Sequence, residues 1–270
     1  MSLAKIAAVV GFEWRRSLTL PRVLWWIVLT TFPVFLVTLV RISAPRNPPY
    51  AVWMGMLYTL LPALVCMLGM FLWTTSAVSA ELERRSWVYI GTRPHGATAM
   101  LIGKWIAAIT WVVPAALVGL TLAIFIASPG AGPAAGPANP AEAGAIRLWA
   151  TLAGLILLSA PAYGALYLLL GAVFYKRAMV IAVVYTVVFE VVLGTVPAIV
   201  NKFTIQFRLR SLLVDWSGVD STEVQSAGFV GDSAWWVHTA ALFGAVVLLL
   251  CGAILTVRFS EYSAAAEAEV

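Results

Sequence analysis

Glu190 is the residue whose type and place most clearly suggest chemistry, because it is an acidic side chain inside the apolar run 179–200. An ionisable group within a membrane span is costly and normally faces the protein interior or water. Glu190, with Thr186 and Gly194 close to it in sequence, could therefore line a substrate path or a seam between subunits. Alternatively, Glu190 is structural, either protonated or hydrogen-bonded, with Thr186 one turn earlier as its partner.

The other reactive side chains do not form a catalytic or metal-binding pattern. His95 and His238 are expected on opposite sides of the membrane, which argues against a metal site that they share. Ser159 lacks the flanking glycines of a Gly-x-Ser-x-Gly nucleophile turn, and the sequence contains no His-Glu-x-x-His. We therefore expect no catalytic residue, metal or cofactor in this chain.

The pair Gly103-Lys104 invites comparison with a phosphate-binding loop, which needs Gly-x-x-x-x-Gly-Lys followed by Ser or Thr. Thr98 stands at the first glycine position and Trp105 at the Ser/Thr position. The sequence therefore has no ATP site of this kind, and any ATP hydrolysis is expected in a separate chain.

The composition predicts the elements that must position these residues. Of the 270 residues, 62% are hydrophobic and 11% are charged, against about 25% charged in an ordinary soluble domain. These values exclude a water-soluble globule and predict a single all-α membrane domain. The net charge of +5 is spread without a compact basic block, so no nucleic-acid partner is expected. Six runs approach the roughly 20 apolar residues that a span needs: 23–40, 51–80, 101–127, 148–174, 179–200 and 234–257.

The distribution of Lys and Arg predicts the orientation, because these residues are enriched in cytoplasmic loops. We expect a multi-pass protein of the inner (cytoplasmic) membrane with both termini in the cytoplasm. Most of the 17 Lys and Arg then lie inside, and the outer side holds only Arg41, Arg46, Arg147, Lys202, Arg208 and Arg210.

Residues 2–20 precede the first span and have apolar side chains at helical spacing, among them Ile6, Val10 and Trp14. This pattern predicts an amphipathic helix that lies in the cytoplasmic interface. The helix could be an anchor alone or a contact surface for a cytoplasmic partner.

Two segments are expected on the outer side of the membrane. The segment 128–145 contains four Pro and four Gly and predicts a flexible loop. In the segment 201–233, apolar and polar residues alternate between Phe203 and Arg210, which favours a strand. Because no second strand is available to pair with it, an interfacial helix or two short helices in the outer leaflet are equal alternatives.

The loop 81–100 between the second and third spans is the most informative segment. Charges are dense at its start, an apolar run follows, a Pro breaks the helix, and a new helix is expected near His95. This pattern predicts a short cytoplasmic helix joined to two spans, although a solvated loop that obeys the positive-inside rule would also fit. The candidate coupling residues are Glu81, Glu83, Arg84, Arg85, Trp87, Arg93 and Pro94, with Gly103 and Lys104 at the start of the next span.

In these residues the chain resembles the ABC type-2 exporter permeases. That family commonly has an acidic-basic cluster after the second span, a short apolar run, a break with Pro, and Gly-Lys entering the third span. The predicted plan is also similar: an N-terminal interfacial helix, six spans, and a long outer stretch before the last span. The sequence differs at Arg85-Ser86, where the family usually has Gly-Thr.

The resemblance implies a membrane subunit of an ATP-driven exporter. In that family two permeases, identical or closely related, enclose a shared path, and separate ATPase subunits that bind ATP and Mg dock partly on the loop between spans two and three. Two alternatives stay open: a subunit that passes ATPase motion to an extracytoplasmic partner without transport, and an intramembrane enzyme built on Glu190 and the histidines. An apolar path with one Glu does not identify the substrate.

Overall fold

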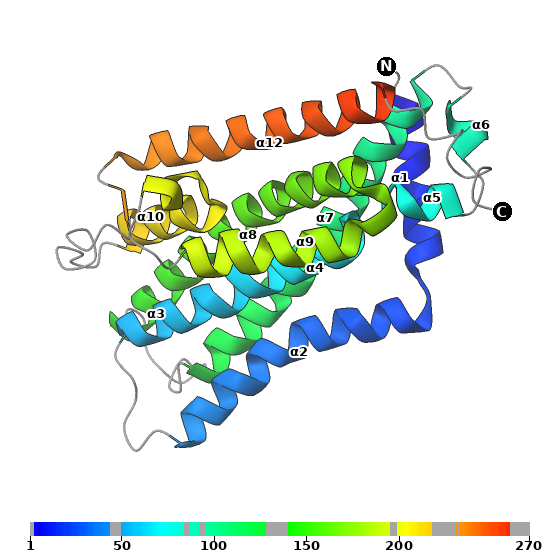
Figure 1. Cartoon of the computed structure of the whole chain (residues 1–270). Coiled ribbons are helices and arrows are strands. Elements are labelled where there is room, and N and C mark those ends of the chain that lie inside the picture. Colours follow the sequence, from blue (N-terminus) through cyan, green and yellow to red (C-terminus); the bar gives the residue numbers. More distant parts are fainter. Residues whose placement is uncertain are drawn as a thin grey trace.

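The structure of the chain is a computed structural model. It describes residues 3–43, 50–83, 87–91, 95–127, 140–194, 199–217, 230–231 and 233–259. Within these ranges the chain is helical and contains no strand, in agreement with the predicted all-α class. Figure 1 shows the helices packed as an elongated bundle.

Five helices are long and apolar enough to cross a membrane, which gives the chain the architecture of a multi-pass membrane protein. The second of these runs, Val52–Leu82, is built from several shorter elements in sequence. The elements are α2 (Leu20–Ser43); α3 (Tyr50–Tyr58), η1 (Thr59–Val65) and α4 (Cys66–Thr74); α7 (Gly96–Ala127); α8 (Pro140–Val173); and α12 (Trp235–Phe259).

The fifth predicted span, 179–200, is shorter and irregular. After the η2 turn (Tyr175–Arg177), α9 (Ala178–Tyr185) continues into the π-helix η3 (Thr186–Leu193). At no more than 1.5 Å per residue, α9 and η3 cover at most about 24 Å, against roughly 30 Å of hydrocarbon. A sixth crossing at this segment therefore stays a prediction.

Segments far apart in the sequence meet at two ends of the bundle (Figure 1). The first, here called the α1 end, holds α1 (Leu3–Ser17), α5 (Ser79–Glu83), α6 (Trp87–Gly91) and the last turn of α12. The second, here called the α10 end, holds α3, α10 (Ile205–Ser217) and the first turn of α12. The described parts of the predicted coupling loop thus lie at the same end as α1 and the last turn of α12.

The helix α8 is the centre of the bundle and packs against α4, α7, α10 and α12. Small residues allow this close packing: a Cβ on Gly171 would overlap the carbonyl oxygen of Thr75. The fully buried Ser159 donates a hydrogen bond to the carbonyl oxygen of Pro62 at 2.6 Å. Its place agrees with a packing role rather than a nucleophilic one.

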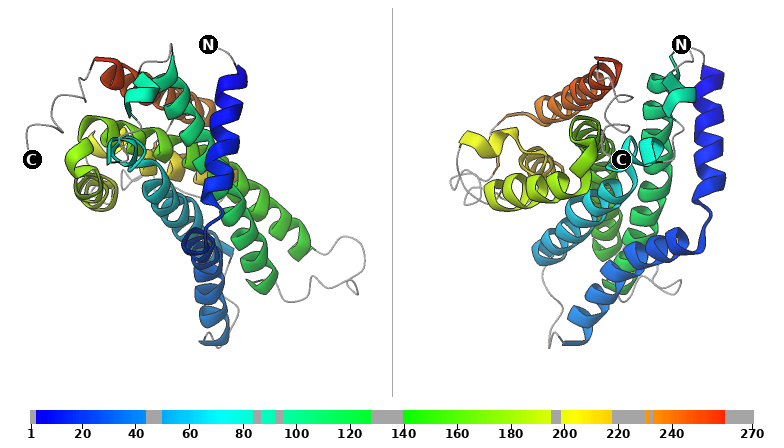
Figure 2. Two further views of the ribbon diagram at one scale, coloured as in Figure 1. Left: turned by 90° about the vertical axis from the view of Figure 1, so that its right-hand side faces the viewer. Right: turned by 45° about the vertical axis from the view of Figure 1, so that its right-hand side comes forward.

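The helix predicted for residues 2–20 is present over Leu3–Ser17, and it runs beside the first half of α7 (Figure 2). Trp14 stacks on Trp111 with ring centroids 4.8 Å apart, and its indole N–H donates to the Thr110 hydroxyl at 2.7 Å. Val9 contacts Gly103, and these two residues come before Trp14 and Trp111 in their respective helices. The two helices are therefore parallel. Whether α1 also lies in a membrane interface stays a prediction.

The prediction of a loop over 128–145 is wrong for its last part, because α8 already begins at Pro140. Proline suits the first position of a helix, where no backbone N–H is needed, and Ala141, Glu142 and Ala143 favour helix. Residues 128–139 lie outside the described residues.

Within the segment 201–233, the strand is the wrong alternative. The short 3₁₀-helix η4 (Ile199–Phe203) leads into α10, which has 13 residues of regular helix. Leu209, Leu212 and Leu213 are buried because α10 packs against α8 and α12. The apolar residues that recur with the 3.6-residue period of a helix are buried by tertiary packing. This burial outweighs the local alternation of apolar and polar residues.

Candidate functional site

An ion-pair cluster of four side chains, Glu13, Arg16, Glu81 and Lys104, joins three helices at the α1 end. The Lys104 Nζ of α7 lies 2.5 Å from the Glu81 Oε1 of α5 and donates to the carbonyl oxygen of Ala77 at 2.9 Å. Glu13 of α1 lies 3.9 Å from the same Nζ. The Arg16 guanidinium of α1 lies 3.5 Å from Glu81 and 3.6 Å from Glu13.

Three of the four members are buried, so their charges depend on their partners, and Arg16 is half-buried. Lys104 is 9% exposed, Glu13 8% and Glu81 6%. Removing one partner of a buried ion pair leaves an uncompensated charge, which costs about 3–5 kcal/mol. The cluster therefore fixes α1, the end of the second span and the start of α7 relative to one another.

Gly103 makes this arrangement sterically possible. A Cβ at this position would lie 2.5 Å from the Cγ1 of Val9. The missing side chain lets α1 approach α7, and the next residue, Lys104, then reaches Glu13 and Glu81. The Gly-Lys pair singled out in the sequence thus has one packing role and one electrostatic role.

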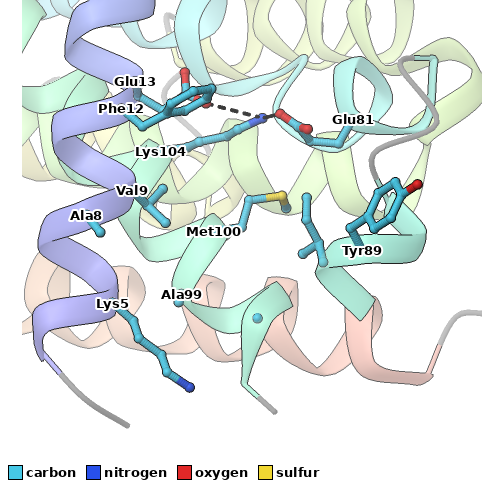
Figure 3. A pocket seen from close by; sticks show the side chains of 12 residues that line it. Lys5, Ala8, Val9, Phe12, Glu13, Glu81, Tyr89, Ala99, Met100 and Lys104 are labelled. Atoms are coloured by element: carbon cyan, nitrogen blue, oxygen red, sulfur yellow. Dashed lines mark hydrogen bonds and ion pairs between the residues drawn. The ribbon is translucent and has the colours of Figure 1, made fainter. Parts of the chain in front are cut away.

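A cavity of about 450 Å³ lies between α1, α6 and α7 (Figure 3). Apolar side chains such as Val9 and Met100 form much of its lining, and the carboxylates and ammonium group of the ion-pair cluster lie at one edge. Tyr89 of α6 lies on the far side from α1, with Lys5 of α1 opposite. The cavity is of the size that binds a drug-sized ligand or an inserted side chain.

The short helix α6 belongs to the loop between the second span and α7, and it covers one side of this cavity. Its Trp87 and Ile90 are half-buried and pack on a cluster that includes Val78 and Met100. The predicted new helix after the Pro break begins at Gly96, following His95, whose φ of 64° is left-handed. The predicted coupling residues Arg84, Arg85, Arg93 and Pro94 lie outside the described residues, and only the backbone of Glu83 is described.

At the α10 end, Glu190 is 3% exposed and caps the first turn of α10. Its Oε1 accepts the backbone N–H of Ile205 at 3.3 Å, and its Oε2 accepts the backbone N–H of Gln206 at 3.2 Å. The Tyr163 hydroxyl donates to Oε2 at 3.3 Å. First-turn amides have no partner within their own helix and carry its positive dipole end, so a carboxylate stabilises them.

Thr186 is not the partner of Glu190, so that part of the structural hypothesis is wrong. Its hydroxyl lies 2.7 Å from the Tyr167 hydroxyl and donates to the carbonyl oxygen of Ala182. The π-helix η3 begins at Thr186, and Glu190 within it turns to the first-turn amides of α10 instead. Gly194 contributes its carbonyl oxygen, which accepts a hydrogen bond from the guanidinium of Arg210.

A cavity of about 250 Å³ lies between η1 and η3 and brings Glu190 and Gly194 together. Tyr58, Gln206 and Arg210 also line it, and the Tyr58 hydroxyl donates to the Gln206 Oε1 at 2.7 Å. Both walls are π-helical, a feature frequent at functional sites. These three residues were not among the predicted site residues. A phenol inside a span was an available signal for Tyr58, because a buried hydroxyl needs a partner.

The two histidines do not share a site. His95 precedes α7 at the α1 end, and His238 lies in the first turn of α12 at the α10 end. Among the residues that the structure describes, no group of three or more His, Cys, Asp or Glu could hold a metal ion.

No family model matches this sequence, and no curated protein matches it.

Proposed function

We propose that the chain is the permease subunit of an ATP-driven exporter similar to the ABC type-2 family. The observation that supports this best is the contact between Glu81 and Lys104, the two ends of the loop motif, 23 positions apart in sequence. Glu13 of α1 joins them. A push on the α5–α6 segment would therefore move α1, the second span and α7 together, as a coupling element must.

In this proposal the α1 end faces the cytoplasm of a cell with an inner membrane. The charge distribution supports that orientation. The test is single-cysteine labelling with an impermeant reagent, after replacing Cys66 and Cys251. A cysteine at Ser86 should be protected in intact cells, whereas a cysteine at Ser221 should be labelled. The reverse pattern would exclude the orientation.

The permease works with a second copy or a close homologue, and Glu190 and Gly194 lie near the substrate path or the seam. In support, α9 and η3 expose a face of apolar side chains, among them Val180, Val184 and Val187, that lipid or a second permease would cover. Native mass measurement of the purified complex should find two permeases. One permease bound to one ATPase would contradict the proposal.

The decisive experiment concerns docking of the ATPase. Arg84→Glu with Arg85→Glu should release an ATPase subunit that co-purifies with the wild-type chain, because losing a charged pair at an interface costs about 2–5 kcal/mol. The matched control is Lys176→Glu with Arg177→Glu in the η2 turn, which should retain the ATPase.

Two outcomes would change the proposal. If the Arg84 and Arg85 variant retains the ATPase at the wild-type level, the loop is a solvated connector. If the wild-type complex hydrolyses ATP in vesicles but moves no substrate, the alternative of a force-transmitting subunit is favoured.

A further inference from the structure

A small polar cavity of about 40 Å³ lies where α1 turns into α2. Four alanines line it, and its polar lining comes from Ser17, Arg22, Trp73 and Ser76, together with Glu13, Arg16 and Lys104 of the ion-pair cluster. This volume holds roughly three water-sized groups. It is too small for a drug-sized ligand but sufficient for the two unesterified oxygens of a phosphodiester.

The charges around this cavity favour an anion. In the ion-pair cluster two carboxylates face two cations, so those charges compensate one another. Arg22 adds a third cation. Its Nη1 donates to the neutral hydroxyl of Ser17 at 2.5 Å, and it takes part in no ion pair within the described part of the chain. The lining therefore carries an excess of positive charge on a side chain suited to phosphate oxygens.

Trp73 of α4 supplies a further donor. Its indole Nε1 is buried and has no hydrogen-bond partner among the described residues. An indole nitrogen can only donate, and buried donors are normally paired. An anionic oxygen in the cavity would satisfy Trp73 and Arg22 together.

The position of the cavity indicates where such an oxygen would come from. Arg22 lies in the first turn of a 24-residue spanning helix, at the level of lipid headgroups. Leu18, Leu20 and Trp25 around it are exposed. Trp25 follows Arg22 by three residues, so both lie on one face of α2. A lipid could therefore place its phosphate against Arg22 and its chains on these apolar side chains.

We propose that this elbow between α1 and α2 is a binding site for the phosphate of an anionic phospholipid. The lipid would hold the α1–α2 junction and the adjacent ion-pair cluster at the membrane surface. This inference does not depend on the transport function, because it requires only that α2 spans a bilayer.

The test compares phosphatidylglycerol with phosphatidylcholine of the same acyl chains, bound to the full-length purified chain and measured by native mass spectrometry. Phosphatidylglycerol should bind more tightly, and Arg22→Gln should weaken its binding about fivefold, the effect of one basic residue near an anionic membrane surface. The matched control is Arg41→Gln at the other end of α2, which should change this binding little.

Other outcomes of these measurements also decide whether the elbow binds an anionic lipid. Equal binding of the two lipids, or no effect of Arg22→Gln, would overturn the site. If inorganic phosphate at millimolar concentration displaces the bound phosphatidylglycerol, the site takes free phosphate and the lipid assignment is wrong. If Arg22→Gln lowers the thermal stability in phosphatidylcholine, the binding test is carried out with the variant Trp73→Phe instead. That variant removes the indole donor and should also weaken phosphatidylglycerol binding.

Discussion

The two ends of the bundle each bury a carboxylate, but they compensate it differently. At the α1 end, Glu81 faces the ammonium group of Lys104 and the guanidinium of Arg16. At the α10 end, Glu190 accepts hydrogen bonds from two backbone amides and the Tyr163 hydroxyl. The first arrangement pairs full charges across three helices, whereas the second holds one carboxyl group mainly through hydrogen-bond dipoles, with the Arg210 guanidinium in the lining of the same cavity.

The difference matters for how each end responds to a perturbation. A buried ion pair becomes very costly when one charge is lost, because the other remains in a medium of low polarity. A cap that consists of several hydrogen bonds is lost in smaller steps, each of about 1–3 kcal/mol. We expect the α1 end to behave as a rigid junction and the N-terminus of α10 to be the more easily released element.

The largest effect should follow from Lys104→Met, which removes the cation but keeps most of the length of the side chain. We expect the free energy of unfolding to fall by about 3–5 kcal/mol, because Glu81 and Glu13 lose their buried partner. Reversible unfolding in mixed micelles measures it. Adding Glu81→Gln should recover part of the loss, and Lys176→Met at an exposed position should cost less than about 0.5 kcal/mol. A small effect of Lys104→Met would remove the contrast between the two ends.

Glu190→Leu tests the dipolar end and should cost about 2 kcal/mol, the range for hydrogen bonds to a charged group. The loss should be local. Hydrogen exchange at the backbone amides of Ile205 and Gln206 should accelerate while the amides of α7 stay protected. Glu190→Gln keeps one acceptor oxygen and should cost about half as much. Uniform acceleration across the bundle would show that Glu190 supports the whole core rather than α10.

Gly103→Ala sharpens the comparison, because it strains the α1 end without changing any charge. The added Cβ collides with Val9, and overpacking of this kind costs about 1–3 kcal/mol. Val9→Ala in the same chain should recover only part of the loss, because the Cβ of residue 9 would still lie 2.7 Å from the added Cβ. As a control, Gly55→Ala meets no atom within 4 Å and should be neutral or stabilise α3 by up to about 1 kcal/mol. Equal effects at the two glycines would argue against close packing of α1 on α7.

The smallest effect is expected for Thr186→Val, which removes the hydrogen bond to Tyr167 while keeping the shape of the side chain. Hydrogen bonds between membrane helices contribute about 0.6 kcal/mol on average. Thr31→Val should change stability still less, because the Thr31 hydroxyl bonds only to its own helix, at Ile27. If Thr186→Val cost as much as Glu190→Leu, η3 would be held mainly by Thr186.

Sequence reasoning identified Glu81 and Lys104 as candidate coupling residues at the α1 end, but it did not identify their contact with each other. In the structure, Glu81 turns inward to Lys104. Both residues could be identified from the sequence, because they belong to the loop motif that resembles the permease family. Their pairing could not be identified from the sequence, because it depends on how the second span and α7 pack.

At the α10 end the same reasoning identified Glu190 and Gly194, but not the hydrogen-bond partners of Glu190. A buried carboxylate within an apolar run is visible by its type alone. Its partners are backbone amides of α10, and a backbone amide has no signature in the sequence. The π-helical turns of η1 and η3 were also missed, because their residues have the hydropathy of ordinary helix.

The sequence by itself determined the helical membrane class and most of the spanning segments, since hydropathy and helix-breaking residues act locally along the chain. Only the tertiary structure decided that α1 lies along α7, that Glu13 and Glu81 share Lys104, and that Glu190 caps α10. These are contacts between residues distant in sequence, and their formation depends on steric details such as the missing side chain at Gly103. A hydropathy pattern shows which side chains must be buried, whereas helix packing selects the neighbours that they meet.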